Sequence, residues 1–121
     1  MPREYHFYVY IVSNYQRTTF YIGFTNDIVR RIIEHKNGLG SAFTKKYKLT
    51  DLIYFEEYQY ADQAISREKE LKGWVRRKKL ALIKKNNPKM ENLNGKLFND
   101  YGISDEEIKE YIKEIKDNLS S

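Results

Sequence analysis

The sequence has no cysteine among its 121 residues, which excludes a disulfide framework and a thiolate metal site. This absence fits a reducing compartment. Long apolar runs are also missing, and none approaches the roughly 20 residues of a membrane-spanning helix. The first residues, MPREYHF, lack the apolar stretch of a secretory signal peptide. We therefore expect an intracellular, cytoplasmic protein.

Acidic residues are scarce over most of the chain. Residues 1–99 contain 19 Lys and Arg but only 10 Asp and Glu, whereas residues 100–121 contain 3 basic and 7 acidic residues. The net charge of +5 thus combines a basic body with an acidic end. A basic body of this kind favours a polyanionic partner such as nucleic acid.

Three segments rich in β-branched and aromatic residues predict strands. They are Phe7–Val12 and Phe20–Phe24, which flank a polar loop, and Leu52–Tyr58. Helical periodicity predicts helices near Asp27–Lys36 and Asp62–Lys85.

The first of these helices carries two polar residues beside its apolar stripe. At about 100° per residue, Arg31 and His35 lie one above the other at the border of the buried face. On the same reasoning Arg30 and Glu34 point away from that face. A snorkelling arginine and an interfacial histidine would also explain the pattern. Thr25 or Asn26 is the expected N-cap of this helix.

The second helix is expected to begin at Asp62, which is a good N-cap, and to break or kink at Gly73. One face carries Ala64, Ile65, Glu68, Leu71 and Lys72. Glu68 thus stands within an apolar stripe, where a lone carboxylate is unfavourable unless it is paired or bound to a cation. A salt bridge to Arg31 or a metal ion would satisfy it.

Two basic segments could contact nucleic acid. The loop 39–51 interleaves Lys45, Lys46 and Lys48 with Phe43 and Tyr47. Lysines suit phosphates and aromatic rings suit bases, although an ordinary solvated loop would also fit. The segment from Arg67 to Lys89 has ten basic and two acidic residues and could border a phosphate track. Its most concentrated part is Arg76, Arg77, Lys78 and Lys79.

The C-terminal end is predicted to be a linker, Asn94–Tyr101, followed by an amphipathic helix, Ser104–Leu119. The apolar stripe of this helix is Ile108, Tyr111, Ile112, Ile115 and Leu119. We expect a domain at residues 1–98 and a separate linker and helix at 99–121. The helix is expected to pack on its own domain in a monomer. Pairing in a homodimer, or an acidic cover over the basic surface, are the alternatives.

The first hairpin and helix resemble the opening of the GIY-YIG nuclease superfamily. The first triplet of the family corresponds to Tyr8-Val9-Tyr10, which keeps only the tyrosine, and the second is intact as Tyr21-Ile22-Gly23. The family's arginine, eight residues after that glycine, falls on Arg31, and its His or Tyr one turn later falls on His35. Its helical glutamate corresponds to Glu68. Over roughly Phe7 to Leu93 the chain is similar to small single-domain members related to the nuclease subunit of bacterial excision repair.

The resemblance implies a small α+β domain, with a three-stranded antiparallel sheet flanked by helices. It also implies a metal-dependent endonuclease that hydrolyses phosphodiester bonds in nucleic acid, with DNA favoured and RNA left open, and a place in DNA repair. Glu68 would hold Mg²⁺ or Mn²⁺, and Arg31 would brace the scissile phosphate. Tyr10 is the favoured general base and Tyr21 would orient phosphate or water, although the reverse assignment stays open. His35 would hydrogen-bond within the site or shuttle a proton.

Several relatives have an asparagine about twelve residues after the glutamate, where this chain has Leu80 flanked by Lys78 and Lys79. A flanking lysine could replace the contact of this asparagine, or the site is incomplete, and two alternatives therefore stay open. One is a nucleic-acid-binding module of the same fold without turnover. The other is a protein-interaction domain that uses the C-terminal helix.

Overall fold

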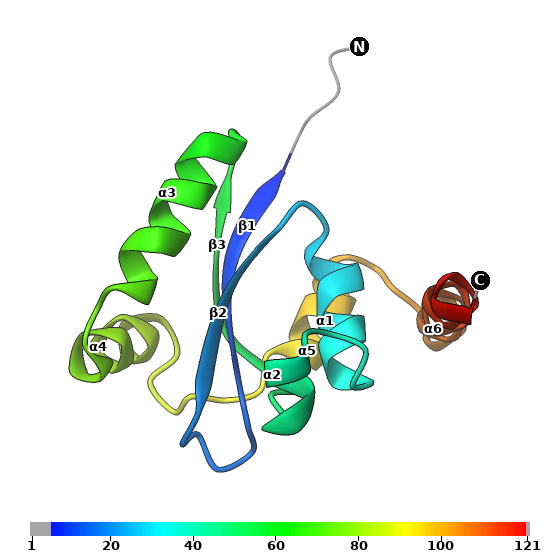
Figure 1. Cartoon of the computed structure of the whole chain (residues 1–121), viewed down its shortest axis with the longest axis horizontal. Coiled ribbons are helices and arrows are strands. Elements are labelled where there is room, and N and C mark those ends of the chain that lie inside the picture. The colour runs from blue at the N-terminus through cyan, green and yellow to red at the C-terminus, as the bar shows by residue number, and fades with distance from the viewer. Residues whose placement is uncertain (1–5, 121) are drawn as a thin grey trace.

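A three-stranded antiparallel sheet forms the centre of the structure, a computed structural model that describes residues 6–120 (Figure 1). The strands are β1 (Phe7–Ser13), β2 (Phe20–Thr25) and β3 (Asp51–Tyr58), in the order β2-β1-β3. Their β-branched and aromatic residues suit a pleated, half-buried surface. The predicted sheet is confirmed, and its strands differ from the expected bounds by one residue at one end.

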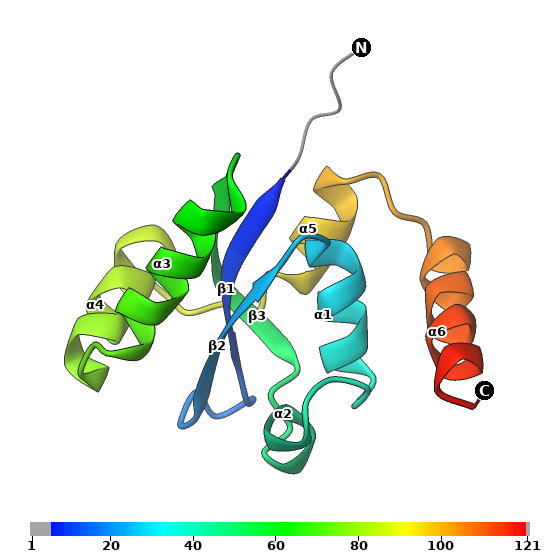
Figure 2. The same cartoon turned by 45° about the horizontal axis from the view of Figure 1, so that its top comes forward.

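Helices cover both faces of this sheet (Figures 1 and 2). They are α1 (Ile28–Lys36), α2 (Ala42–Lys46), α3 (Ala61–Lys72), α4 (Arg76–Asn86), α5 (Asn94–Asp100) and α6 (Asp105–Ser120). The helices α3 and α4 lie on one side of the sheet, and α1, α5 and α6 lie on the other. None of these helices within residues 6–120 is long and apolar enough to cross a membrane.

The alternation of side chains along β1 divides the core into two apolar clusters. Val9 and Ile11 join the cluster that α3 and α4 complete, whereas Tyr8, Tyr10 and Val12 join the cluster that α1 completes. Successive strand residues point to opposite faces, so the central strand is buried on both sides. The tyrosine of the first triplet is therefore directed toward α1.

The helix starts differ from those expected. Asp27 itself is the N-cap of α1, and its carboxylate accepts a hydrogen bond from the backbone N–H of Arg30 at 3.1 Å. Thr25 accepts from the N–H of Asp27 at 3.0 Å, which holds the turn before the helix. The prediction of Thr25 or Asn26 as N-cap was therefore wrong. Asp62 was also wrong as the N-cap of α3, because it lies in the first turn, where its charge favours the helix dipole.

The break at Gly73 is confirmed, since α3 ends at Lys72 and α4 begins at Arg76. Ala64 and Leu71 are buried on the inner face of α3, as expected. Ile65 is 37% exposed and lies off that face, which corrects its assignment to the apolar stripe. The loop 39–51 also contains the short helix α2, which had not been predicted.

The chain after α4 runs along the outer edge of β3. The side-chain amide of Asn87 donates to the carbonyl of Ile53 at 3.0 Å, and Asn94 accepts from the N–H of Leu52 at 2.9 Å. These bonds satisfy a sheet edge that would otherwise be open. Asn94–Asp100 is the helix α5 and not a linker, because Leu97 and Phe98 are buried against α1. The expected division between residues 98 and 99 falls inside this helix.

The C-terminal helix α6 packs beside α1, as the favoured interpretation predicted. Ile115 is buried in the α1 cluster, and Arg30 of α1 forms an ion pair with Glu114 at 3.1 Å. Leu119 is 67% exposed, so the buried stripe ends one turn earlier than expected. The contact lies within one chain, and the homodimer stays an open alternative.

Candidate functional site

Tyr10 lies at the centre of the sheet and directly opposite Gly23 of β2. A Cβ atom at position 23 would lie 2.8 Å from Cε1 of Tyr10 and closer still to Cζ and the hydroxyl. Only glycine leaves room for the phenol to cross the neighbouring strand. The glycine of the second triplet therefore places the tyrosine of the first.

The hydroxyl of Tyr10 is hydrogen-bonded to Nε2 of His35 on α1 at 2.9 Å. Tyr10 is fully buried and His35 is 3% exposed. Burial raises the pKa of Tyr10 above its ordinary value, and the nearby Arg31 opposes part of this rise. Burial, together with Arg31, lowers the pKa of His35 to about 4. At neutral pH the two side chains are therefore an uncharged, hydrogen-bonded pair.

Arg31 borders this pair, as the helical spacing predicted. Its side chain is 41% exposed, and its Nε lies 3.2 Å from Oε1 of Glu34. That Nε is buried but has no hydrogen-bond partner among the described residues. Glu34 therefore turns toward the site, which contradicts the prediction that it points away. Arg30 instead reaches α6.

Tyr21 connects the buried pair with the surface. Its ring lies edge-on to Tyr10 at 6.4 Å and to His35 at 6.0 Å between centroids. On its outer side it meets Phe43 of α2 at 6.3 Å, and the ammonium of Lys72 lies over it at 5.7 Å. Tyr21 is partly exposed, and none of the described residues hydrogen-bonds to its hydroxyl. The phenol oxygen is thus available to a ligand.

Glu68 joins the site through Lys72. Its side chain is 18% exposed, and Oε2 lies 3.5 Å from Nζ of Lys72, one turn along α3. The salt bridge to Arg31 considered from the sequence is not formed, since Arg31 pairs with Glu34. Both Glu68 and Tyr21 therefore lie next to the same ammonium group.

A divalent cation at Glu68 would have one protein ligand. No group of three or more His, Asp or Glu side chains within residues 6–120 could hold a metal ion. One carboxylate, completed by phosphate oxygens and waters, is a common arrangement for Mg²⁺. The donor set fits such an ion only when Lys72 moves aside, which its half-exposed side chain permits.

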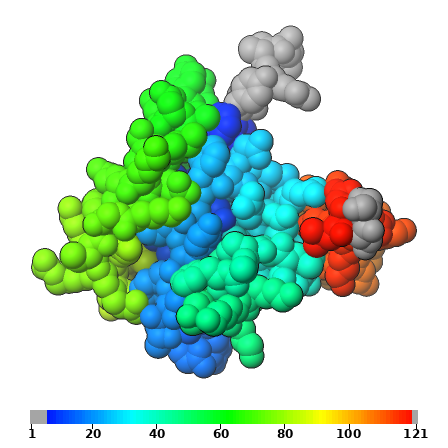
Figure 3. Space-filling view, in the orientation of Figure 1, coloured from blue at the N-terminus to red at the C-terminus, as the bar shows by residue number. Residues whose placement is uncertain are grey.

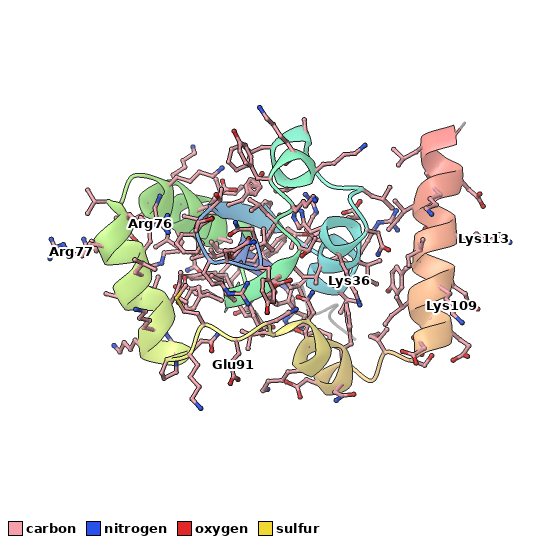
Figure 4. All side chains as sticks on the ribbon, turned by 90° about the horizontal axis from the view of Figure 1, so that it is seen from below. Lys36, Arg76, Arg77, Glu91, Lys109 and Lys113 are labelled. Carbon is pink, nitrogen blue, oxygen red and sulfur yellow. The ribbon has the colours of Figure 1, made fainter. Side chains whose placement is uncertain are left out.

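The predicted nucleic-acid-binding residues flank the β2 edge on two sides. Lys45, Lys46 and Lys48 are exposed on and just after α2. At the start of α4, the guanidinium of Arg76 lies over the ring of Phe20 at 4.5 Å, and Arg77 extends outward (Figure 4). Figure 3 shows β2 on the visible face between α3 and α2. The site residues thus lie between two basic elements.

Lys78 does not take the place of the missing asparagine in this structure. Its ammonium lies 4.3 Å from the centre of the Trp74 ring, where Arg67 also lies, at 5.1 Å. Arg67 in turn donates three hydrogen bonds to the carboxylate of Glu56. Lys78 therefore belongs to a contact between α3 and α4, and Lys79 is partly buried.

Sequence reasoning missed three contributors to the site. Glu34 is recognised by its contact with Arg31, and Lys72 by its contacts with Glu68 and Tyr21. Gly40 is the third, because a Cβ atom there would lie 2.6 Å from Nδ1 of His35. The presence of Lys72 on the same face as Glu68 was the only signal in the sequence.

Comparison with known proteins identifies relatives over the first two thirds of the chain. Residues 6–81 match the family described as the GIY-YIG catalytic domain. A UPF0213 protein from Staphylococcus saprophyticus is 41% identical over 76 residues, which cover 63% of this chain and 92% of that protein. A UPF0213 protein from Staphylococcus epidermidis is 37% identical, with the same coverage. The solution NMR structure of a UPF0213 protein from Bacillus halodurans is 31% identical. It covers 72% of this chain and 92% of its own, with a TM-score of 0.48.

Proposed function

The chain belongs to the GIY-YIG catalytic domain family, and from this premise we propose that it is a metal-dependent endonuclease acting on DNA. The observation that carries the proposal is the convergence of Tyr10, His35, Arg31 and Tyr21 at the β2 edge. An isolated structural histidine would not need beside it an arginine, whose buried Nε lies near Glu34 without hydrogen-bond geometry, and a partly exposed tyrosine. The roles below are part of the proposal.

Arg31 is the proposed contact for the scissile phosphate. Its guanidinium matches the geometry of phosphate oxygens, and its buried Nε has no hydrogen-bond partner among the described residues. Glu34 lies beside it and holds the side chain near the site in the free protein. A phosphate would compete with Glu34 for the guanidinium, so its entry would loosen this ion pair.

The two tyrosines are assigned by their exposure. Tyr10 is fully buried against His35 and has a raised pKa, so it is poorly placed to remove a proton from water. Tyr21 is partly exposed, and the ammonium of Lys72 can stabilise negative charge developing on its oxygen. We therefore assign the proton-accepting role to Tyr21 and a positioning role to Tyr10 and His35. This reverses the preference drawn from the sequence.

Glu68 is the residue that would hold Mg²⁺ or Mn²⁺. A bound divalent cation supplies charge stabilisation at the phosphate and at the leaving oxygen. In the free protein the ammonium of Lys72 neutralises this carboxylate in part. Lys72 would have to leave Glu68 for the ion to bind, and its ammonium would then be free to pair with a phosphate of the DNA.

A DNA-binding module without turnover is the second candidate. Leu80 stands where several relatives have an asparagine, and Lys78 is engaged with Trp74. Neither residue supplies a second ligand, so Glu68 would be the one protein ligand of the metal in the proposed site. A module that binds DNA but does not cut it would keep the basic elements α2 and α4.

The test is cleavage of supercoiled and of single-stranded DNA by the purified protein with Mg²⁺ or Mn²⁺. Glu68→Ala and Arg31→Ala are each expected to lose about 10²–10³ in rate, as removal of a transition-state charge partner does. Tyr21→Phe should lose more activity than Tyr10→Phe. Binding without cleavage in every metal would favour the second candidate, and equal rates in Glu68→Ala and the parent protein would refute the assigned site.

A further inference from the structure

Two aromatic rings, one on α2 and one on its C-cap residue, are half exposed beside the proposed site. Phe43 is 46% exposed and Tyr47 is 43% exposed, and their ring centroids are 4.8 Å apart. They lie one turn apart on the same side of the helix. A single exposed apolar residue needs no explanation, but two rings in contact beside the proposed site form an apolar patch, and such patches can mark a ligand-binding surface.

The ring pair contacts the proposed site through Phe43. Phe43 contacts Tyr21 at 6.3 Å between centroids, and Tyr21 contacts His35 at 6.0 Å. A planar group stacked on Phe43 would therefore leave what is attached to it next to the phenol of Tyr21. Figure 3 shows α2 on the same face as β2, with no helix over them.

The segment that carries the rings is basic and has no acidic residue. From residue 39 to residue 50 the sequence has three lysines and neither Asp nor Glu. The ammonium of Lys46 lies over the ring of Tyr47 at 5.3 Å, and Lys45 and Lys48 are exposed. This combination of rings and positive charge matches a nucleotide, which has an aromatic base and an anionic phosphate.

Buried contacts anchor the segment that carries the rings against the site. Thr44, between the rings, is buried, and its hydroxyl donates to the carbonyl of Ser41 at 3.0 Å. Gly40 packs against His35 and Thr44, so the start of α2 rests on the histidine of the site. Lys48 adopts a positive φ of 56°, and the chain then turns back to bury Leu49. A group stacked on the rings would be fixed relative to Tyr21.

We propose that Phe43 and Tyr47 stack an unpaired base, so that the site acts on DNA whose strand is unpaired next to the scissile phosphate. Both faces of a base inside a duplex are covered by its neighbours, and the rings can reach a base only in a single strand, at an end or at a junction. This inference deepens the proposed function and rests on it. It names the substrate class as single-stranded DNA or a junction of single-stranded and duplex DNA.

The experiment measures binding in EDTA, where cleavage does not interfere. Fluorescence anisotropy compares a short single-stranded oligodeoxynucleotide with the duplex of the same sequence. The parent protein should bind the single strand at least about 10-fold more tightly, because stacking of a base contributes strongly to such complexes. The variant with both Phe43→Leu and Tyr47→Leu should lose roughly 10- to 100-fold in single-strand affinity and little in duplex affinity.

Tyr60→Leu is the matched control, since Tyr60 is 56% exposed at the start of α3 and has no ring contact with the site. It should bind both DNAs as the parent does. The variant with Phe43→Tyr and Tyr47→Phe keeps both rings and should retain the single-strand preference. A 2-aminopurine base in the single strand should lose fluorescence when the parent binds, which tests stacking without any substitution.

Equal loss of single-strand and duplex affinity in the leucine variant would overturn the inference. Duplex binding as tight as single-strand binding, or unchanged 2-aminopurine fluorescence, would also overturn it. Failure of the proposed function looks different, because the protein would then stack the base but not cleave. Conversely, cleavage of DNA with no sign of stacking would support the proposed nuclease function and refute the preference for unpaired DNA.

Discussion

Replacing Gly23 with alanine tests how the site is built. The added Cβ would lie 2.8 Å from Cε1 of Tyr10 and closer to its hydroxyl, so the phenol or the strand must move. Overpacking of a core typically costs about 1–3 kcal/mol. Moving Tyr10 also leaves Nε2 of His35 buried without its partner, which costs about 1–3 kcal/mol more. We expect Gly23→Ala to lower the unfolding free energy by roughly 2–6 kcal/mol.

Gly95→Ala is the matched control for this substitution. No atom lies within 4 Å of a Cβ added at Gly95, which is within α5. Alanine is favoured over glycine in a helix by about 0.5–1 kcal/mol, so this variant should be slightly more stable than the parent. Thermal unfolding followed by circular dichroism measures the stability of both variants. For a chain of this size, each kcal/mol of unfolding free energy should shift the melting temperature by about 3–6 °C. A Gly23→Ala protein that melts at or above the parent temperature would refute the proposed crossing of Tyr10 over β2.

Three further predictions concern the histidine, the C-terminal helix and the basic loop. His35, with its pKa lowered to about 4, binds a proton more readily in the unfolded chain. The stability that neutral His35 contributes is therefore fully present above pH 6.5. The unfolding free energy should fall by on the order of 3 kcal/mol as the pH is lowered to about 4. Urea unfolding across this range should show a shallower pH dependence for His35→Gln; an unchanged slope would contradict the burial argument. Ile115→Ala should destabilise the protein by about 2–3 kcal/mol, whereas Leu119→Ala should change stability by less than about 0.5 kcal/mol. Equal losses in calorimetry would argue against the packing of α6 on α1. Reversing the charge of Lys45 and Lys46 should weaken DNA binding and reduce the dependence of log affinity on log salt by about 1.5–2. An unchanged salt slope would exclude α2 from the interface.

Local patterns in the sequence were sufficient for most of the secondary structure. Strand composition located all three strands, and the apolar spacing of α1 placed Arg31 and His35 on the correct side. The break at Gly73 was also predictable. Helix caps were harder to predict from the sequence. Thr25, Asn26 and Asp27 are all good N-caps, and the backbone conformation decides among them.

Contacts between distant residues limited what the sequence could predict about the site. The resemblance to a nuclease family brought Tyr10, Tyr21, Arg31 and His35 together, and the structure places them within one cluster. Their exposure depends on the whole fold, however, and no spacing rule predicts that Tyr10 is buried while Tyr21 reaches the surface.

The short helix α5 illustrates the same limit. Its seven residues are too few for a helical period, and Gly95 favoured a linker. Burial of Leu97 and Phe98 against α1 stabilises it as a helix. Similarly, the stripe on α6 is buried at Ile115 but not at Leu119, and this end of the stripe depends on the packing of the whole fold.

The most direct test of the central claim is the rate of DNA cleavage as a function of Mg²⁺ concentration, in the parent and in Glu68→Gln. This substitution keeps the shape of the side chain but removes the charge that would hold the ion. The parent should cleave at a rate that rises with Mg²⁺ and saturates, and EDTA should abolish cleavage. Glu68→Gln should cleave about 10²-fold or more slowly at every Mg²⁺ concentration. Cleavage that persists in EDTA, or a Glu68→Gln rate equal to that of the parent, would contradict the account.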